Sequence, residues 1–348
     1  MLFGDEVARL GQRLKLDGSN ATLVSPHAPA TLGVAARRLL AGRTVRLFVV
    51  GGSAAAGAGG IGVNRTLDAR LAEKMNAALS QAETSTGRSF GRVVRTSVAQ
   101  GGTTSFWAAL MAETLHGRQP HLLLWEYSIN DHAVSLEAAS RAGLSKDAGR
   151  TFGAETMRYL LDYWLRRTLT LGSPPPALLL AYLWDKQPAA AFKAGNRAYC
   201  RRMPVPGSAF SAQRPVLDQF ASAGAGLVAL NMARYVTERR YGNFCPLVAD
   251  SYFHPSDEGH ELIADLLTLT LMRLLDEGAT MHRADLGAKR RGGGKGGGGK
   301  GGGWGDSGKG KGKGGGYGKG GSGKGRDGGK GKGSGKGKGG YKSYNDSY

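Results

Sequence analysis

The chain has 348 residues and a formal net charge of +20, and this charge is distributed unevenly. Residues 289–348 contain 16 Lys/Arg and 3 Asp/Glu, so this segment alone carries +13. Its composition, rich in glycine and poor in apolar side chains, excludes a packed core and predicts a disordered, Gly/Lys-rich basic tail. The other roughly 285 residues are enough for one large α/β domain with a well-buried core.

Predicted helices and strands alternate along the rest of the chain. Apolar residues at three-to-four spacing indicate helices, and short apolar runs rich in β-branched residues indicate strands. Helices at 3–16 and 31–41 form an N-terminal helical extension, residues 1–44. The domain that follows, residues 45–288, is predicted to have strands at 45–50, 92–98, 121–127, 176–184 and 227–230, helices at 65–83, 104–116, 151–170, 211–224 and 257–276, and an irregular basic loop at 185–209.

The location of the protein in the cell is left open by the sequence. No apolar stretch approaches the ~20 residues that a membrane-spanning helix requires. The N-terminal segment is amphipathic and contains acidic residues, so it does not have the pattern of a signal peptide. Cytoplasmic and secreted locations are therefore both open. The two cysteines, Cys200 and Cys245, are interpreted as buried or free thiols, with a single disulfide as the alternative.

Strands that alternate with helices predict a parallel sheet covered on both faces. Reactive groups in such a sheet gather at the carboxyl ends of its strands. Ser53, Gly102 and Asn130 each follow a predicted strand, whereas Asp250 and His254 lie in the loop before the last predicted helix. We therefore expect these five residues to meet at one edge of the sheet.

Their chemistry is that of a serine hydrolase. Small residues around Ser53 permit a sharp turn that exposes the hydroxyl as a nucleophile. His254 is the candidate base that takes the proton from this hydroxyl, with Asp250 orienting the imidazole ring. The candidate oxyanion hole consists of the backbone N–H groups of Ser53 and Gly102 and the carboxamide of Asn130.

Other interpretations of the same motifs have less support. The glycines around Ser53 also suit an anion-binding turn, but no Lys-Ser/Thr pair follows, and this excludes a phosphate-binding loop of the Walker type. A dinucleotide-binding motif is disfavoured because no acidic residue ends a second strand where it could bind the ribose. A zinc site built from Asp250, His254 and His260 lacks further soft ligands. His260 falls within the last predicted helix and is interpreted as structural. The sequence predicts no metal and no cofactor.

The motifs Gly51-Gly52-Ser53, Gly101-Gly102-Thr103, Ser128-Ile129-Asn130-Asp131 and Asp250-Ser251-Tyr252-Phe253-His254-Pro255 resemble the ordered blocks of the SGNH hydrolase family, the GDSL-like esterases and lipases. The resemblance covers residues 45–275. It implies a three-layer α/β/α sandwich with a five-stranded parallel sheet, the flavodoxin-like SGNH fold. It also implies the roles given above to Ser53, Gly102, Asn130, Asp250 and His254.

The chain departs from the family pattern at four positions. Gly52 replaces the usual Asp before the serine, Ser97 stands where Asn is frequent, and Ser128 replaces a Gly. Asp250 lies four residues before His254, where three is usual.

The expected function is a serine esterase that hydrolyses an acetyl or acyl ester of a carbohydrate or lipid through a covalent acyl-enzyme. An acyltransferase that uses the same site is one alternative. Another is a weakly active or inactive hydrolase fold that binds a carbohydrate or polyanion through residues 289–348, because a flexible cationic chain attracts acidic polysaccharides and nucleic acids.

Overall fold

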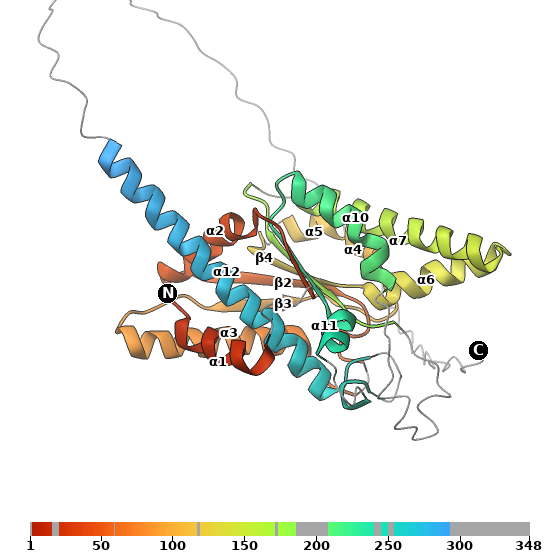
Figure 1. Cartoon of the computed structure of the whole chain (residues 1–348), viewed down its shortest axis with the longest axis horizontal. Helices are drawn as coiled ribbons and strands as arrows, with labels where there is room; N and C mark the ends of the chain where they lie inside the picture. Colours follow the sequence, from red (N-terminus) through yellow and green to blue (C-terminus); the bar gives the residue numbers. More distant parts are fainter. Residues whose placement is uncertain are drawn as a thin grey trace, which may run out of the picture. The chain divides into compact units, whose positions relative to one another are not determined.

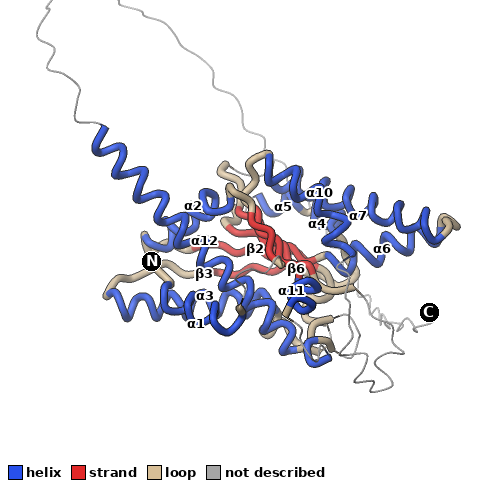
Figure 2. The backbone as a smooth tube through the Cα atoms, viewed as in Figure 1, coloured by secondary structure: helices blue, strands red, loops and turns tan. Residues whose placement is uncertain are grey.

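A six-stranded sheet forms the centre of the molecule (Figure 2). The computed structural model describes residues 2–15, 21–58, 60–116, 119–170, 173–185, 208–239, 245–249 and 254–292. The strand order is β1-β6-β5-β4-β2-β3. The strands are β1 (Thr22–Val24), β2 (Val45–Gly51), β3 (Val93–Ser97), β4 (Leu122–Glu126), β5 (Ala177–Tyr182) and β6 (Leu227–Asn231).

The expected parallel sheet is present, with one strand added. Strands β2 to β6 pair in parallel with their neighbours, whereas β1 pairs antiparallel with β6, Thr22 opposite Leu230. This edge strand lies in the segment that was expected to be a helical extension. It has three residues, too few to produce an alternating pattern, so only its pairing with β6 defines it.

Helices cover both faces of the sheet (Figure 1). One layer contains α1 (Gly4–Leu14), α2 (Ala28–Leu40), α3 (Leu67–Thr86) and α12 (Asp257–Gly292). The opposite layer contains α4 (Ser105–Leu110), α5 (Ala112–His116), α6 (Ser128–Arg141), α7 (Lys146–Leu169) and α10 (Ser208–Ser222). The short helix α11 (Met232–Glu238) follows β6, and a 3₁₀ turn, η1, spans Cys245–Leu247. The three-layer α/β/α sandwich predicted from the sequence is therefore confirmed.

Two apolar cores lie on the two faces of the sheet. Successive side chains of a strand point to opposite faces. Leu47 and Val49 of β2 accordingly belong to the core beneath α1, α2, α3 and α12, whereas Phe48 and Val50 pack against α4, α7 and α10. Strands β4, β5 and β6 are buried along their whole length, as expected of parallel strands covered on both sides.

Among the described helices, α6 and α11 have no counterpart in the sequence predictions, and α12 is longer than predicted. Helix α6 buries Ser128, Ile129, Asp131, Ser135 and Ala139, so its inward face is mostly small or polar and gives no apolar stripe. Helix α11 has seven residues, fewer than two full turns. Helix α12 continues to Gly292, beyond the predicted end at residue 276. Most of the predicted loop 185–209 lies outside the described residues.

Two sequence expectations concern the cysteines and a membrane-spanning helix. Cys245 is bonded in a disulfide, so the expectation of a thiol is wrong at this position, and Cys200 lies outside the described residues. Within the described ranges, no helix is long and apolar enough to span a membrane.

Candidate active site

Ser53 lies in a tight turn directly after the central strand β2. The backbone N–H of Gly52 donates to the carbonyl of Glu126 at the end of β4, at 2.8 Å. The chain then turns helically, because Ala56 N–H donates to the Gly52 carbonyl at 3.0 Å and Ala58 N–H donates to the Ser53 carbonyl at 2.9 Å. The turn leaves Ser53 partly exposed at the carboxyl edge of the sheet, between β3 and β4.

The imidazole of His254 lies against this serine. Its Nε2 is 2.6 Å from Ser53 Oγ, and the histidine is 8% exposed. Its backbone carbonyl accepts a hydrogen bond from Ala249 N–H at 2.9 Å, and Val248 forms a β-bridge with Pro255. The structure thus brings together a hydroxyl and an imidazole that are 201 positions apart in the chain.

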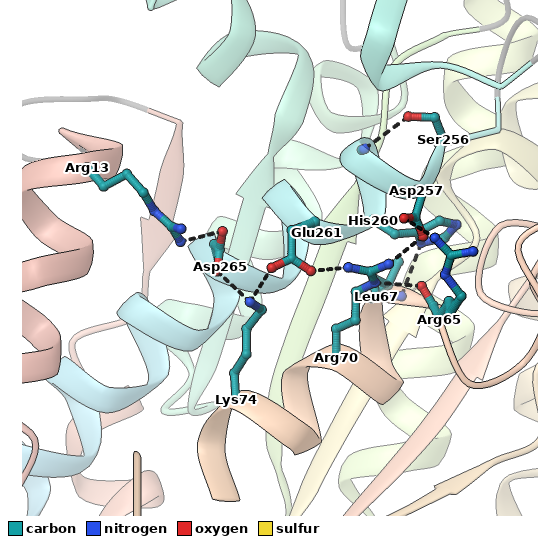
Figure 3. Close-up of polar contacts among 11 residues, drawn as sticks. Arg13, Arg65, Leu67, Arg70, Lys74, Ser256, Asp257, His260, Glu261 and Asp265 are labelled. Carbon is teal, nitrogen blue, oxygen red and sulfur yellow. Dashed lines mark hydrogen bonds and ion pairs between the residues drawn. The ribbon is translucent and has the colours of Figure 1, made fainter. Parts of the chain in front are cut away.

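Helix α12 begins at Asp257, three residues after His254, and is anchored to α3 (Figure 3). Ser256 caps its start, accepting a hydrogen bond from Gly259 N–H at 3.1 Å. Arg70 on α3 forms ion pairs with Asp257 and Glu261 in the first turns of α12. Since β2, the Ser53 turn and α3 follow one another in the chain, these pairs hold the histidine segment next to the serine segment.

The second histidine of this region, His260, has a structural role. Its Nδ1 accepts a hydrogen bond from Leu67 N–H, at the first residue of α3, at 3.1 Å (Figure 3). Burial, with a smaller effect from Arg70, lowers the pKa of His260 to about 4. The ring is therefore neutral at pH 7, which leaves a nitrogen free to accept the Leu67 hydrogen bond. The described residues contain no cluster of three His, Cys, Asp or Glu that could hold a metal ion.

The loop after β3 reaches the serine through its glycines. Gln100 N–H donates to the Gly51 carbonyl at 2.9 Å, and a Cβ on Gly101 would lie 3.8 Å from the Cβ of Ser53. Gly102 has a φ of +75°, whereas a Cβ on it would meet no atom within 4 Å. The requirement for glycine at 102 is therefore conformational: other residues rarely adopt this backbone region.

Asn130 lies on the other side of the serine turn and packs onto Gly52. A Cβ on Gly52 would be 2.4 Å from Asn130 Oδ1 and 3.0 Å from Nδ2. The carboxamide thus occupies the space that the side chain of any residue other than glycine would need. This contact gives a physical reason for one departure from the family pattern, since an Asp at position 52 would collide with Asn130 where it now lies.

Asp131, next to Asn130, connects α6 to the start of α4. Its Oδ1 accepts from Ser105 N–H at 2.9 Å, and its Oδ2 lies 2.6 Å from Ser105 Oγ. The indole N–H of Trp125 donates to the same hydroxyl at 2.8 Å. Burial raises the pKa of Asp131 to about 7. This buried network fixes the loop that carries Gly102 and the first turn of α6, which carries Asn130, relative to each other.

Glu126 is a fully buried carboxyl group directly beneath the serine turn. Its Oε2 is 3.3 Å from the Ala55 N–H that donates to it, and Ser128 Oγ is 3.3 Å from its Oε1. Burial raises the pKa of Glu126 to about 8, so at pH 7 the group is largely a neutral acid. The sequence motifs give Glu126 no role, although one feature of the sequence distinguishes it: it is the one acid in the apolar strand β4, LLLWE.

Of the five residues predicted for the site, the structure brings Ser53, Gly102, Asn130 and His254 to one edge of the sheet. Asp250 lies outside the described residues.

Comparisons with known proteins give likenesses to solved structures only. No protein-family model matches the chain, and no curated protein sequence matches it. A two-domain esterase (CEX) active on acetylated mannans aligns over 72% of this chain and 53% of its own, at 20% identity and a TM-score of 0.44. The chain thus spans about half the length of that esterase.

Two further structures align over nearly their whole length. A variant of Axe2, an acetyl xylan esterase from Geobacillus stearothermophilus, covers 65% of this chain and 94% of its own, at 16% identity and a TM-score of 0.42. A protein of the G-D-S-L lipolytic family from Desulfitobacterium hafniense DCB-2 covers 64% and 98%, at 10% identity and a TM-score of 0.39.

Proposed function

We propose that this chain is an SGNH-type serine hydrolase that cleaves an ester bond. The observation that carries the proposal is the 2.6 Å contact between Ser53 Oγ and His254 Nε2, at the edge of the sheet where the Gly101–Gly102 loop and Asn130 converge. A nucleophile within hydrogen-bond distance of a base is the arrangement that acyl transfer to serine requires.

The proposed reaction would use this geometry in two stages. His254 Nε2 takes the proton of Ser53 Oγ as this oxygen attacks the carbonyl carbon of the ester. The N–H groups of Ser53 and Gly102 and the carboxamide of Asn130 donate to the oxyanion that forms. The C–O bond to the alcohol then breaks, and the alcohol leaves with the proton held by His254. Water then attacks the acyl-Ser53 carbonyl as His254 takes one of its protons. The bond between Ser53 Oγ and the acyl carbon breaks, His254 returns the proton to Ser53 Oγ, and the carboxylic acid leaves.

Asp250 is our candidate for the group that orients the His254 ring. A carboxylate at Nδ1 would keep Nε2 free to accept the serine proton and would stabilise the imidazolium. This role is supported by the sequence alone, through the position of Asp250 four residues before His254. The substrate we propose is an acetyl or longer acyl ester of a carbohydrate or lipid, and transfer to an acceptor other than water would use the same steps.

The test is hydrolysis of p-nitrophenyl esters of increasing acyl length by the full-length chain, beside the Ser53→Ala variant. Ser140→Ala is the matched control, because Ser140 is an exposed serine on α6 outside the site. We expect turnover that is lost in Ser53→Ala and retained in Ser140→Ala. The preferred acyl length distinguishes acetyl esters from lipid-like esters.

A fluorophosphonate probe gives a second readout that needs no knowledge of the substrate. It should label the wild-type chain and Ser140→Ala on one serine, and it should fail to label Ser53→Ala. Absence of both turnover and labelling in the folded chain would reject the hydrolase and favour a binding protein.

A further inference from the structure

A large cavity lies at the edge of the sheet opposite Ser53. Its volume is about 750 Å³, and it lies where α2 ends and where β4 and β5 begin, with Pro174–Pro176 and His121 among the lining residues. Strand β2 runs from this edge to the serine turn, and the steps between its seven residues, roughly 3.3 Å each, separate the two sites by about 20 Å. A cavity of this volume is in the range of pockets for small organic ligands, roughly 300–1,000 Å³.

The lining of this cavity is strongly cationic. Arg37, Arg38 and Arg43 contribute to it, and none of the described residues that line it has a carboxylate. The remainder combines hydrogen-bonding groups, such as the Gln119 amide, with an apolar surface of prolines.

Two of the three arginines are not committed to a structural contact. Arg38 Nε donates to the Thr44 carbonyl at 3.0 Å, which closes the turn after α2. By contrast, within the described part of the chain no hydrogen bond or ion pair is formed by the side chains of Arg37 and Arg43. The C-terminus of α2 attracts positive charge in its last turn, where Arg37 and Arg38 lie. Arg43 lies beyond the helix, and that effect does not account for it.

The half-buried His121 responds to the positive charge around the cavity. Burial, followed by the charges of Arg38 and Arg46, lowers the pKa of His121 to about 4. Its Nδ1 accepts from Arg46 N–H at 2.9 Å, so the ring proton is on Nε2, and the neutral imidazole adds a donor rather than an acceptor. The ionisable groups of the lining are therefore either positively charged or neutral donors.

We propose that this cavity is a binding site for a small organic anion, whose phosphate or carboxylate group is held by the guanidinium groups of Arg37 and Arg43. Guanidinium groups bind phosphates and carboxylates through paired N–H donors. The uncharged remainder of the ligand, of nucleoside or oligosaccharide size, would lie against the proline surface. The site is separate from Ser53 and does not depend on the proposed esterase activity.

The test is isothermal titration calorimetry on the full-length chain with four probes. AMP presents a phosphate and trigalacturonate presents carboxylates, whereas adenosine and maltotriose are their uncharged counterparts. Each is titrated into the wild type, into Arg37→Ser/Arg43→Ser, and into Arg141→Ser/Arg150→Ser. The second double variant removes the same charge from α6 and α7, away from the cavity, and retains the basic tail.

We expect AMP or trigalacturonate to bind the wild type at one site, with at least tenfold weaker binding to Arg37→Ser/Arg43→Ser and unchanged binding to Arg141→Ser/Arg150→Ser. The probe that binds identifies the anionic group. The proposal is overturned if neither anion binds at millimolar concentration, if both double variants weaken binding equally, or if the uncharged probes bind as well. Circular dichroism verifies that both variants are folded, independently of any ester hydrolysis.

Discussion

Replacing Gly52 by alanine should disable the site while leaving the fold intact. The added Cβ would lie 2.4 Å from Asn130 Oδ1 and 2.7 Å from Cγ, whereas ordinary contacts begin at 3.4 Å. The Asn130 carboxamide must therefore move by about 1 Å, and oxyanion donors act over a narrow range, roughly 2.7–3.1 Å. Because Gly52 is outside the left-handed backbone region and only the end of a side chain is in the way, the backbone can accept alanine.

The expected loss is that of one oxyanion donor, about 2.7–4 kcal/mol of transition-state stabilisation, or roughly two to three decades in kcat. The unfolding midpoint in urea should change little, since alanine at a compatible glycine position alters stability by only about 0.4–1 kcal/mol. The assay is p-nitrophenyl ester hydrolysis by Gly52→Ala, Asn130→Ala and the double variant.

The double variant identifies the cause. If Gly52→Ala acts by displacing the Asn130 carboxamide, the double variant should have nearly the same kcat as Asn130→Ala alone, because that variant has already lost the carboxamide. Gly149→Ala on α7 is the matched control, since its Cβ would approach no atom closer than Ala139 Cβ, at an ordinary 3.5 Å, away from the serine turn, and it should stay active. Additive losses in the double variant, or full activity of Gly52→Ala, would refute the reasoning.

Three further predictions concern other parts of the chain. Burial raises the folded pKa of Glu126 to about 8, above the ordinary 4.5, so the free energy of unfolding of the wild type should fall by up to about 5 kcal/mol as pH rises from about 4.5 to 8. Glu126→Gln removes this titration and should therefore become more stable relative to wild type over the same window. A difference in urea unfolding that does not change with pH would contradict this. Ser105→Ala should lower the free energy of unfolding by about 1–3 kcal/mol, because Asp131 and Trp125 each lose a buried partner; an unchanged urea midpoint would argue against it. Deleting residues 293–348 should leave hydrolysis of small esters unchanged but abolish any salt-sensitive retention on heparin, and retention by the truncated chain would place polyanion binding elsewhere.

The sequence was sufficient for the arrangement of the layers and for the position of the candidate site. Strands 45–50, 121–127 and 176–184 are apolar runs, and their alternation with helices already implies a parallel sheet. Because the carboxyl ends of parallel strands share one edge, the positions of Ser53 and Asn130 after two such strands were enough to predict that they meet. The order of the four motifs identified His254 as the candidate base.

Contacts between distant residues were decided only by the tertiary structure. Strand β1 has three residues and exists because β6 offers a free edge. The raised pKa of Glu126 results from burial under the turn that contains Ala55, 71 positions away. Gly52 differs from the Asp of the motif that the sequence resembles. Only the packing of Asn130 shows that glycine at this position leaves room for the Asn130 carboxamide. Local patterns record which face of an element is buried, whereas desolvation, steric exclusion and the charge of a cavity depend on which side chains meet through space.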